Sequence, residues 1–175
     1  MSPAALPGRN AARSTATVIR LTVGLSGPAY GARVVLRVVL GVVFTGMAAG
    51  QLASWSAMPS ILNAYRVLPT PALPVLAAGL IAAELVCGVW FLARPRSAAV
   101  TPVWMYTVVS MVWAGLGLQA YVRGLPVENC GCFGVYLTQR LSLFVLAQDA
   151  LLLIYAALLL RAALRRPRIE LQEAR

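Results

Sequence analysis

The stretch ALPVLAAGLIAAELVCGVWFLA, residues 72–93, decides the fold. It is apolar throughout except for Glu84, and it stops at the polar turn Arg94-Pro95-Arg96. A helix needs about 20 apolar residues to cross the roughly 30 Å hydrocarbon core of a bilayer. The segment therefore predicts a transmembrane helix.

Three further apolar segments have similar length. They cover residues 34–53, 100–121 and 141–160. Of the 175 residues, 60% are hydrophobic and only 11% are charged, and the mean hydropathy is +0.78. Soluble domains average about 25% charged residues, so a soluble fold is excluded. The chain is predicted to be an all-α polytopic membrane protein, a bundle of four transmembrane helices in the lipid bilayer.

The basic residues have an unusual composition and placement. All fifteen are Arg, the formal net charge is +10, and the sequence contains no His. The arginines lie at the ends of the apolar segments, so they indicate membrane topology rather than nucleic-acid binding. The lack of His excludes Ser-His-Asp hydrolases, His-containing zinc sites and Glu-x-x-His di-iron bundles.

The distribution of arginine also predicts the orientation. Most arginines fall on the side that holds both termini, whereas the other side has only Arg66, Arg123 and Arg140. Positive residues favour the cytoplasmic side. We therefore expect a plasma-membrane protein with both termini in the cytoplasm and the 54–71 and 122–140 loops outside. The predicted organisation is a flexible basic cytoplasmic tail (1–33), the transmembrane domain (34–163) and a second basic cytoplasmic tail (164–175).

The 122–140 loop contains a closely spaced cysteine pair, Cys130 and Cys132, on either side of Gly131. Such a pair on the oxidising side of a membrane has three plausible uses: thiol-disulfide exchange, binding of a soft metal such as Cu(I), or a static disulfide. A Cys-x-Cys bridge departs from relaxed disulfide geometry and is therefore easy to reduce. It also restrains very little chain, so it is a poor structural brace. Redox exchange by Cys130 and Cys132 is the favoured interpretation.

The transmembrane segments contain other groups with possible chemistry. Cys87 lies roughly 22 Å into its span at 1.5 Å per residue, so we expect it to be a packing residue. Glu84 lies about 18 Å and Asp149 about 12 Å into their spans. Ionisable residues at this depth are costly, which suggests function. One interpretation is a proton path or a polar contact to a quinone-like ligand. The other is an interhelical hydrogen bond, with Gln51, Gln119 or Gln148 as candidate partners.

Several of these residues together resemble a known family. The most specific match is the run Cys130-Gly131-Cys132-Phe133-Gly134, which follows Arg123-Gly124 and precedes Asp149 in the fourth span. Weaker matches are Gly41, Phe44, Gly50, Tyr65, Leu68-Pro69, Ala83-Glu84-Leu85 and Gly88. Over roughly residues 34–160 the chain resembles the MauE family of the MauE/DoxX group. It departs from the expected pattern at Gln51, where a Lys is expected.

The resemblance implies an accessory membrane protein for disulfide formation or thiol transfer in exported client proteins, acting with a thioredoxin-like exported partner. Namesake members support the maturation of methylamine dehydrogenase. Cys130 and Cys132 are then expected to cycle between disulfide and dithiol, and to exchange electrons with a quinone or another protein. Nearby Arg123 and Arg140 are expected to favour a thiolate. Glu84, Asp149 and Gln119 are weaker candidates for a cofactor contact.

A different class of function is also compatible with the sequence. The chain would then be a non-enzymatic assembly subunit or a small-solute carrier, and its cysteine pair would be structural or metal-binding. The sequence leaves open whether the pair makes the chain a thiol-disulfide oxidoreductase component. It also leaves open which cysteine attacks first.

Overall fold

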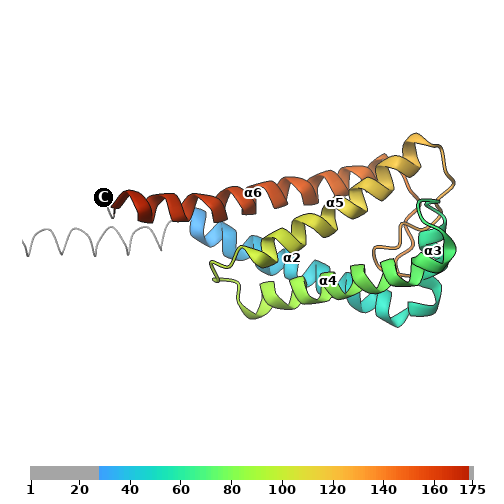
Figure 1. Cartoon of the computed structure of the whole chain (residues 1–175), viewed down its shortest axis with the longest axis horizontal. Helices are drawn as coiled ribbons and strands as arrows, with labels where there is room; N and C mark the ends of the chain where they lie inside the picture. Colours follow the sequence, from blue (N-terminus) through green and yellow to red (C-terminus); the bar gives the residue numbers. More distant parts are fainter. Residues whose placement is uncertain (1–27, 174–175) are drawn as a thin grey trace, which may run out of the picture. The chain divides into compact units, whose positions relative to one another are not determined.

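The computed structural model describes residues 28–173, and side chains from Tyr30 to Leu164. The described part of the chain is helical and contains no strand (Figure 1). Four helices have the length and composition to cross a membrane, which confirms the predicted all-α architecture with four spans. The helices are α2 (Pro28–Ala53), α3 (Met58–Asn63), α4 (Leu73–Ala93), α5 (Thr101–Val122) and α6 (Leu143–Glu173), with short 3-10 turns at Trp55–Ala57 and Thr70–Ala72.

Two helices extend past the predicted span limits. α2 begins at Pro28 rather than at residue 34, and proline suits a first helical turn because its missing N–H has no partner there. α6 continues to Glu173, well beyond residue 160. Arginine is a good helix former, so the arginines that end the apolar segment do not end the helix. Residues 28–33 and 164–173, assigned to the tails, are thus helical, whereas residues 1–27 lie outside the described part.

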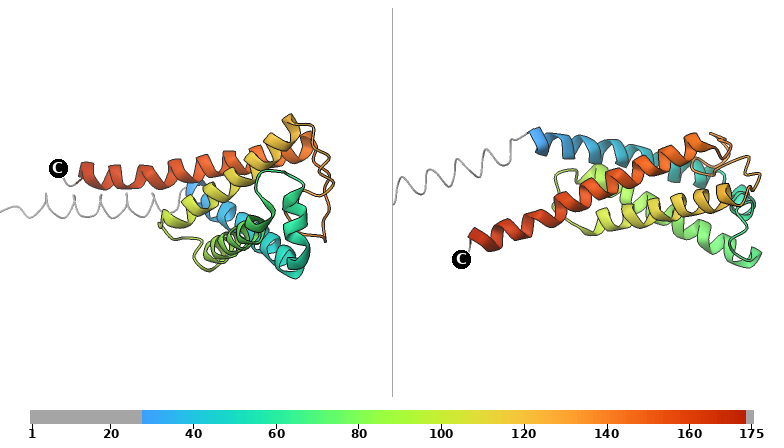
Figure 2. Two further views of the ribbon diagram at one scale, coloured as in Figure 1. Left: turned by 45° about the vertical axis from the view of Figure 1, so that its right-hand side comes forward. Right: turned by 90° about the horizontal axis from the view of Figure 1, so that it is seen from above.

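The chain divides into two compact units, Met1–Val35 and Leu36–Arg175. The described residues of the first unit, 28–35, form the beginning of α2. Within the second unit, α4 contacts α3 and α5, and α5 contacts α6 (Figure 2). The transmembrane segment of α5 is half buried, whereas that of α6 is only 22% buried. α5 is therefore a central helix, and α6 offers most of its surface to lipid.

Tyr106 of α5 joins three other helices in the core. Its ring lies 4.9 Å from that of Phe44 in α2 and 6.0 Å from that of Phe91 in α4. Its hydroxyl donates a 2.8 Å hydrogen bond to the backbone oxygen of Leu152 in α6. All three aromatic side chains are fully buried, so this cluster forms the centre of the apolar core.

Helices α2 and α4 cross closely at two glycines. A β-carbon added to Gly88 would lie 2.5 Å from Thr45 Oγ1 and 2.7 Å from the Thr45 backbone nitrogen. One added to Gly41 would lie 2.9 Å from the side chain of Leu92. Small residues at helix crossings permit this close approach in membranes, where packing rather than hydrophobic burial joins helices.

Replacing Gly88 with alanine is expected to destabilise the protein by about 1–3 kcal/mol, because the added methyl group overpacks the crossing against backbone. The matched control is Gly79→Ala on the same helix, since Gly79 has open space where its β-carbon would lie. Thermal unfolding of the detergent-solubilised protein measures both. Equal unfolding temperatures for the two variants would contradict the close approach of α2 and α4 at Gly88.

The two ends of the second unit are built differently. At the end formed by residues 94–100, called here the turn end, Arg37 donates a hydrogen bond to the backbone oxygen of Ser97. Its guanidinium carbon lies 5.4 Å from the centre of the Phe91 ring. Arg37 is buried, so its side chain packs within the bundle rather than extending to the lipid headgroups. Because α2 begins at Pro28, Arg37 lies well inside the helix.

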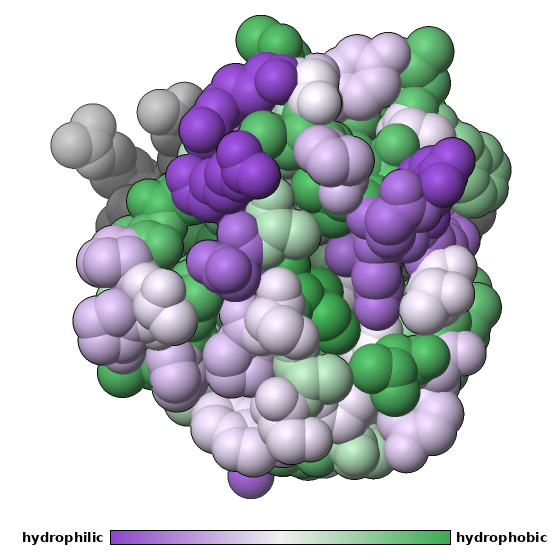
Figure 3. All heavy atoms as spheres, turned by 90° about the vertical axis from the view of Figure 1, so that its right-hand side faces the viewer, coloured by the Kyte–Doolittle hydropathy of each residue, from purple (hydrophilic) through white to green (hydrophobic). Residues whose placement is uncertain are grey.

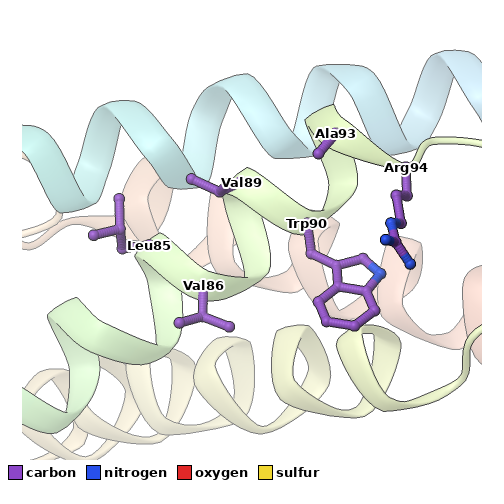
Figure 4. A pocket seen from close by; sticks show the side chains of 6 residues that line it. All are labelled: Leu85, Val86, Val89, Trp90, Ala93 and Arg94. Atoms are coloured by element: carbon purple, nitrogen blue, oxygen red, sulfur yellow. The ribbon is translucent and has the colours of Figure 1, made fainter.

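A shallow groove of about 540 Å³ runs along α4 toward the turn end (Figure 4). Its lining is almost entirely apolar, with Arg94 at one end, where the guanidinium carbon lies 5.8 Å from the centre of the Trp90 ring. Much of this lining is exposed in the structure, as expected of a surface that faces lipid chains. The groove contains neither Cys130 nor Cys132.

Candidate redox site

The opposite end, called here the loop end, carries α3 and the cysteine loop, residues 123–142 (Figure 1). The loop begins where Gly124, at φ +64°, ends α5 in a left-handed turn. Two backbone hydrogen bonds close it: Cys130 N–H to Gln139 O at 2.8 Å and Leu141 N–H to Val127 O at 2.9 Å. Hydrophilic side chains form separate groups on the face of this end (Figure 3).

Asn129 shapes the turn that holds the cysteines. Its side-chain oxygen accepts a 3.0 Å hydrogen bond from the Gly131 N–H, and its side-chain nitrogen donates a 2.8 Å bond to Gly134 O. Asn commonly bonds its own backbone in this way to form a turn. Gly131 has φ +85° and Gly134 φ +62°, conformations that glycine adopts without strain.

The cysteine loop is docked on α2. A β-carbon added to Gly50 would lie 2.7 Å from Phe133 O, so the loop backbone rests directly on this helix. Ser54 accepts a 3.3 Å hydrogen bond from the Val135 N–H and donates a 2.7 Å bond to Gly50 O. The loop therefore lies against the transmembrane bundle rather than standing free of it.

The two thiols of the pair are hydrogen-bonded, with their Sγ atoms 3.3 Å apart. Cys130 is buried, with 2% of its surface exposed, whereas Cys132 is partly exposed. The hydrogen bond with the Cys132 thiol lowers the pKa of Cys130 to about 7, against the opposing effect of burial. The same hydrogen bond, together with burial, raises the pKa of Cys132 well above its ordinary value. The structure thus makes Cys130 the more acidic thiol and Cys132 the more exposed residue of the pair.

Each cysteine carbonyl is held by a different part of the bundle. The Tyr65 hydroxyl, from the segment after α3, donates a 2.8 Å hydrogen bond to Cys130 O. Gln51 of α2 donates a 3.0 Å bond to Cys132 O. Burial raises the pKa of Tyr65, so its hydroxyl stays protonated and remains a donor. Gln119 of α5 supports Tyr65 by donating a 2.9 Å bond to its backbone oxygen.

Gln51 also connects the cysteine loop to Glu84. The same side-chain nitrogen donates a 2.9 Å hydrogen bond to one carboxylate oxygen of Glu84, and the Trp113 indole donates to the other. Glu84 is fully buried. Its carboxylate therefore joins α2, α4 and α5, which is the geometry required by the interhelical interpretation of this acid.

Asp149 reaches the same region from α6. It is 8% exposed, and a β-carbon added to Gly117 would lie 3.1 Å from its Oδ2 atom. The negative charge of Asp149 contributes to raising the pKa of both Cys130 and Cys132. No described residue donates a hydrogen bond to its carboxylate. Asp149 is thus an acid that acts electrostatically on both thiols.

The structure corrects one expectation about the pair. Arg123 and Arg140 do not account for the acidity of Cys130: Arg123 donates to Gln119 Oε1 and Arg66 O, and Arg140 forms a 2.7 Å ion pair with Glu128. Both arginines bond to groups other than the thiols. The pair itself is partly covered, because the loop is folded against α2 and Cys130 is buried.

The site also contains residues that the sequence did not single out for a role. Trp113 lies in a membrane helix and Ser54 in the turn after one, where an aromatic and a small polar residue are common. Tyr65 was noticed only through the family resemblance, and its hydroxyl gives it a direct contact with the pair. Cys87, in contrast, is a packing residue, as its depth in the span predicts. It is fully buried, and its thiol donates a 3.3 Å hydrogen bond to Pro102 O.

The candidate cofactor residues differ in whether their polar side-chain atoms are already hydrogen-bonded within the protein. The polar atoms of Glu84 and Gln119 are hydrogen-bonded within the protein, so a quinone contact would have to displace those bonds. Asp149 has a carboxylate without a donor. Among the described residues, no group of three or more Cys, Asp, Glu or His side chains is arranged to hold a metal ion. A metal would have only the two thiols of the pair as ligands.

Comparison with known proteins identifies the family of the chain. The family model described as methylamine utilisation protein MauE matches residues 30–162, which is most of the chain. No curated protein and no solved structure matches the chain significantly. The matched range contains all four transmembrane segments up to residue 162, the cysteine loop and the residues that anchor it. The chain therefore belongs to the family of methylamine utilisation protein MauE.

Proposed function

We propose that this membrane protein is a thiol-disulfide redox accessory protein that supports disulfide formation in exported proteins. The observation that carries the proposal is the cysteine pair itself. Its sulfur atoms lie 3.3 Å apart, and both carbonyls are held by side chains of the bundle. A relaxed disulfide needs about 2.05 Å between sulfurs, so a modest movement of the side chains and loop closes or opens the bond.

The proposed location is the plasma membrane, with the loop end outside the cell. The support is the arginine distribution, since residues 94 and 96 and the arginines near both termini would then all be cytoplasmic. Disulfide chemistry is favoured in the oxidising space outside the cytoplasm.

The proposed partner is an exported thioredoxin-like protein that exchanges with Cys130 and Cys132 through a mixed disulfide, and the final clients are exported proteins. The chain has three cysteines and hence no second pair to carry electrons across the bilayer. Electrons are therefore passed between the loop and a quinone or another protein on the same side. The family description names methylamine utilisation, and the client reaction that we propose is the maturation of methylamine dehydrogenase.

The test is thiol trapping in intact cells. Cells that carry Cys130→Ser, Cys132→Ser or the double variant are quenched with acid and alkylated, and mixed disulfides are resolved by non-reducing electrophoresis. We expect at least one single variant to trap a partner, and the double variant to lower the disulfide content of exported proteins. Cys87→Ser is the matched control and should behave as wild type, because Cys87 is buried away from the pair.

The same experiment separates the alternative class of function. If neither single variant traps a partner and the double variant leaves exported disulfides unchanged, the chain is an assembly subunit or carrier with a structural or metal-binding pair. A reporter fused after Gly124 tests the orientation separately. A cytoplasmic signal from that fusion contradicts the proposed location of the loop.

A further inference from the structure

We infer that Cys132 is the sulfur attacked by a partner thiolate and that Cys130 is the leaving group, so that the cysteine loop takes electrons from a partner dithiol. This inference rests on the proposed function and deepens it. It assigns separate roles to the two cysteines and a direction to the exchange.

Access separates the two sulfurs. Cys130 is only 2% exposed, whereas Cys132 is partly exposed at the loop end. The backbone between them is also covered, since a β-carbon added to Gly131 would lie 2.8 Å from the Ile61 side chain and 3.6 Å from the Trp113 ring. An incoming protein thiolate must approach one sulfur of the disulfide directly. While the loop stays docked, it reaches Cys132 first.

The anchors of the loop keep this asymmetry in place. Tyr65 holds Cys130 O from one side, and the Cys130 N–H is bonded to Gln139 O. Cys130 is thereby tied at both its backbone donor and its acceptor. Cys132 is tied through its carbonyl by Gln51. Exposing Cys130 would require several of these bonds to break, whereas Cys132 is already partly exposed.

The acidity of the reduced pair bears on the reverse reaction. That reaction begins with Cys132 attacking a disulfide in another protein, since Cys130 is buried. The hydrogen bond with Cys130, together with burial, raises the pKa of Cys132, which leaves little Cys132 thiolate for this attack. The reverse reaction is therefore slow to begin.

The steps balance without a further reactant. A partner thiolate attacks Cys132 Sγ, forms a mixed disulfide, and releases the Cys130 thiolate. The second partner thiolate then attacks the partner's own sulfur in the mixed disulfide and releases Cys132, which takes up a proton. The partner dithiol is oxidised to a disulfide, and the loop disulfide is reduced to two thiols.

The test uses glutathione as the probe thiol. The purified full-length protein, with its loop disulfide formed, is mixed briefly with reduced glutathione and quenched with N-ethylmaleimide. Trypsin then releases residues 124–140, which contain both loop cysteines, and places Cys87 in another peptide. Fragmentation of the 124–140 peptide locates the glutathione. We expect glutathione on Cys132 with maleimide on Cys130 in at least tenfold excess over the reverse arrangement.

The possible results of this experiment test the cysteine assignment separately from the proposed function. Glutathione located equally on both cysteines, or mainly on Cys130, overturns the assignment and leaves the proposed function standing. Failure of the pair to form any disulfide under a mild oxidant overturns both. A second measurement compares the two cysteines without disulfide exchange. A bulky maleimide should label the remaining Cys132 of Cys130→Ser at least tenfold faster than the remaining Cys130 of Cys132→Ser. The opposite order contradicts the inference.

Discussion

Gly134→Ala is expected to release the cysteine loop from α2 and to raise the alkylation rate of Cys130 by more than about tenfold. A β-carbon at this position would overlap the Ser54 hydroxyl and lie 2.7 Å from Gly50 O. Gly50 belongs to a helix and cannot retreat, so the loop must move instead. The added methyl group would also place an alanine at φ +62°, which costs about 1–2 kcal/mol.

Gly124→Ala provides the matched control. Gly124 has nearly the same backbone angle, φ +64°, and nothing lies within 4 Å of its β-carbon position. The two variants share the backbone strain and differ in the collision with α2. Cysteine alkylation followed by mass spectrometry of the 124–140 peptide measures both. Similar Cys130 labelling in the two variants would mean that docking on α2 does not protect this thiol.

Glu84→Ala is expected to cause the largest loss of stability, on the order of 3 kcal/mol or more. The change leaves the Trp113 indole without its acceptor and removes one of the two acceptors of the Gln51 amide, and a buried unpaired donor costs about 1–3 kcal/mol. It also opens a cavity between α2, α4 and α5. Because Gln51 loses one of its two anchors, we also expect weaker docking of Cys132. Thermal unfolding in detergent and cysteine labelling report these two effects.

Glu84→Gln separates the loss of the hydrogen bonds from the loss of the carboxyl group. The new amide retains an oxygen that accepts from Trp113. The side-chain oxygen of Gln51 has no hydrogen-bond partner among the described residues, so Gln51 can turn and accept from the new amide nitrogen. Glu84→Gln should therefore unfold at a temperature between that of the wild type and that of Glu84→Ala. A wild-type midpoint for Glu84→Ala would show that the carboxylate does not hold the helices together.

The sequence was sufficient for the four spans, because length and apolar composition alone determine which segments cross a bilayer. It was less informative at the helix ends. α2 begins at Pro28 and α6 ends at Glu173, since continued helix formation in polar flanking residues depends on local propensity rather than on hydropathy. The short helix α3 was missed because six residues carry too little periodicity to be recognised.

The candidate site was predicted as separate parts. Cys130 and Cys132 were recognised by their spacing, and Glu84 by its depth, but nothing in the one-dimensional pattern placed them next to each other. That proximity depends on the loop folding back onto α2 at Gly50 and on Gln51 bonding Glu84 and Cys132 at once. Distant pairings of this kind are tertiary contacts, which local periodicity does not encode.

The two carbonyl anchors on the cysteine pair also bear on how long a partner would stay attached in the proposed exchange. Tyr65 and Gln51 fix the backbone on either side of Gly131, and the two sulfurs lie 3.3 Å apart. A thiol held this close acts at a very high effective concentration, because little chain entropy is lost when it reacts. In the proposed exchange, a mixed disulfide at one cysteine would be resolved rapidly by its neighbour, so an intact pair would release any thiol that does not complete the exchange. The loop would thereby favour partners with a second thiol already in position.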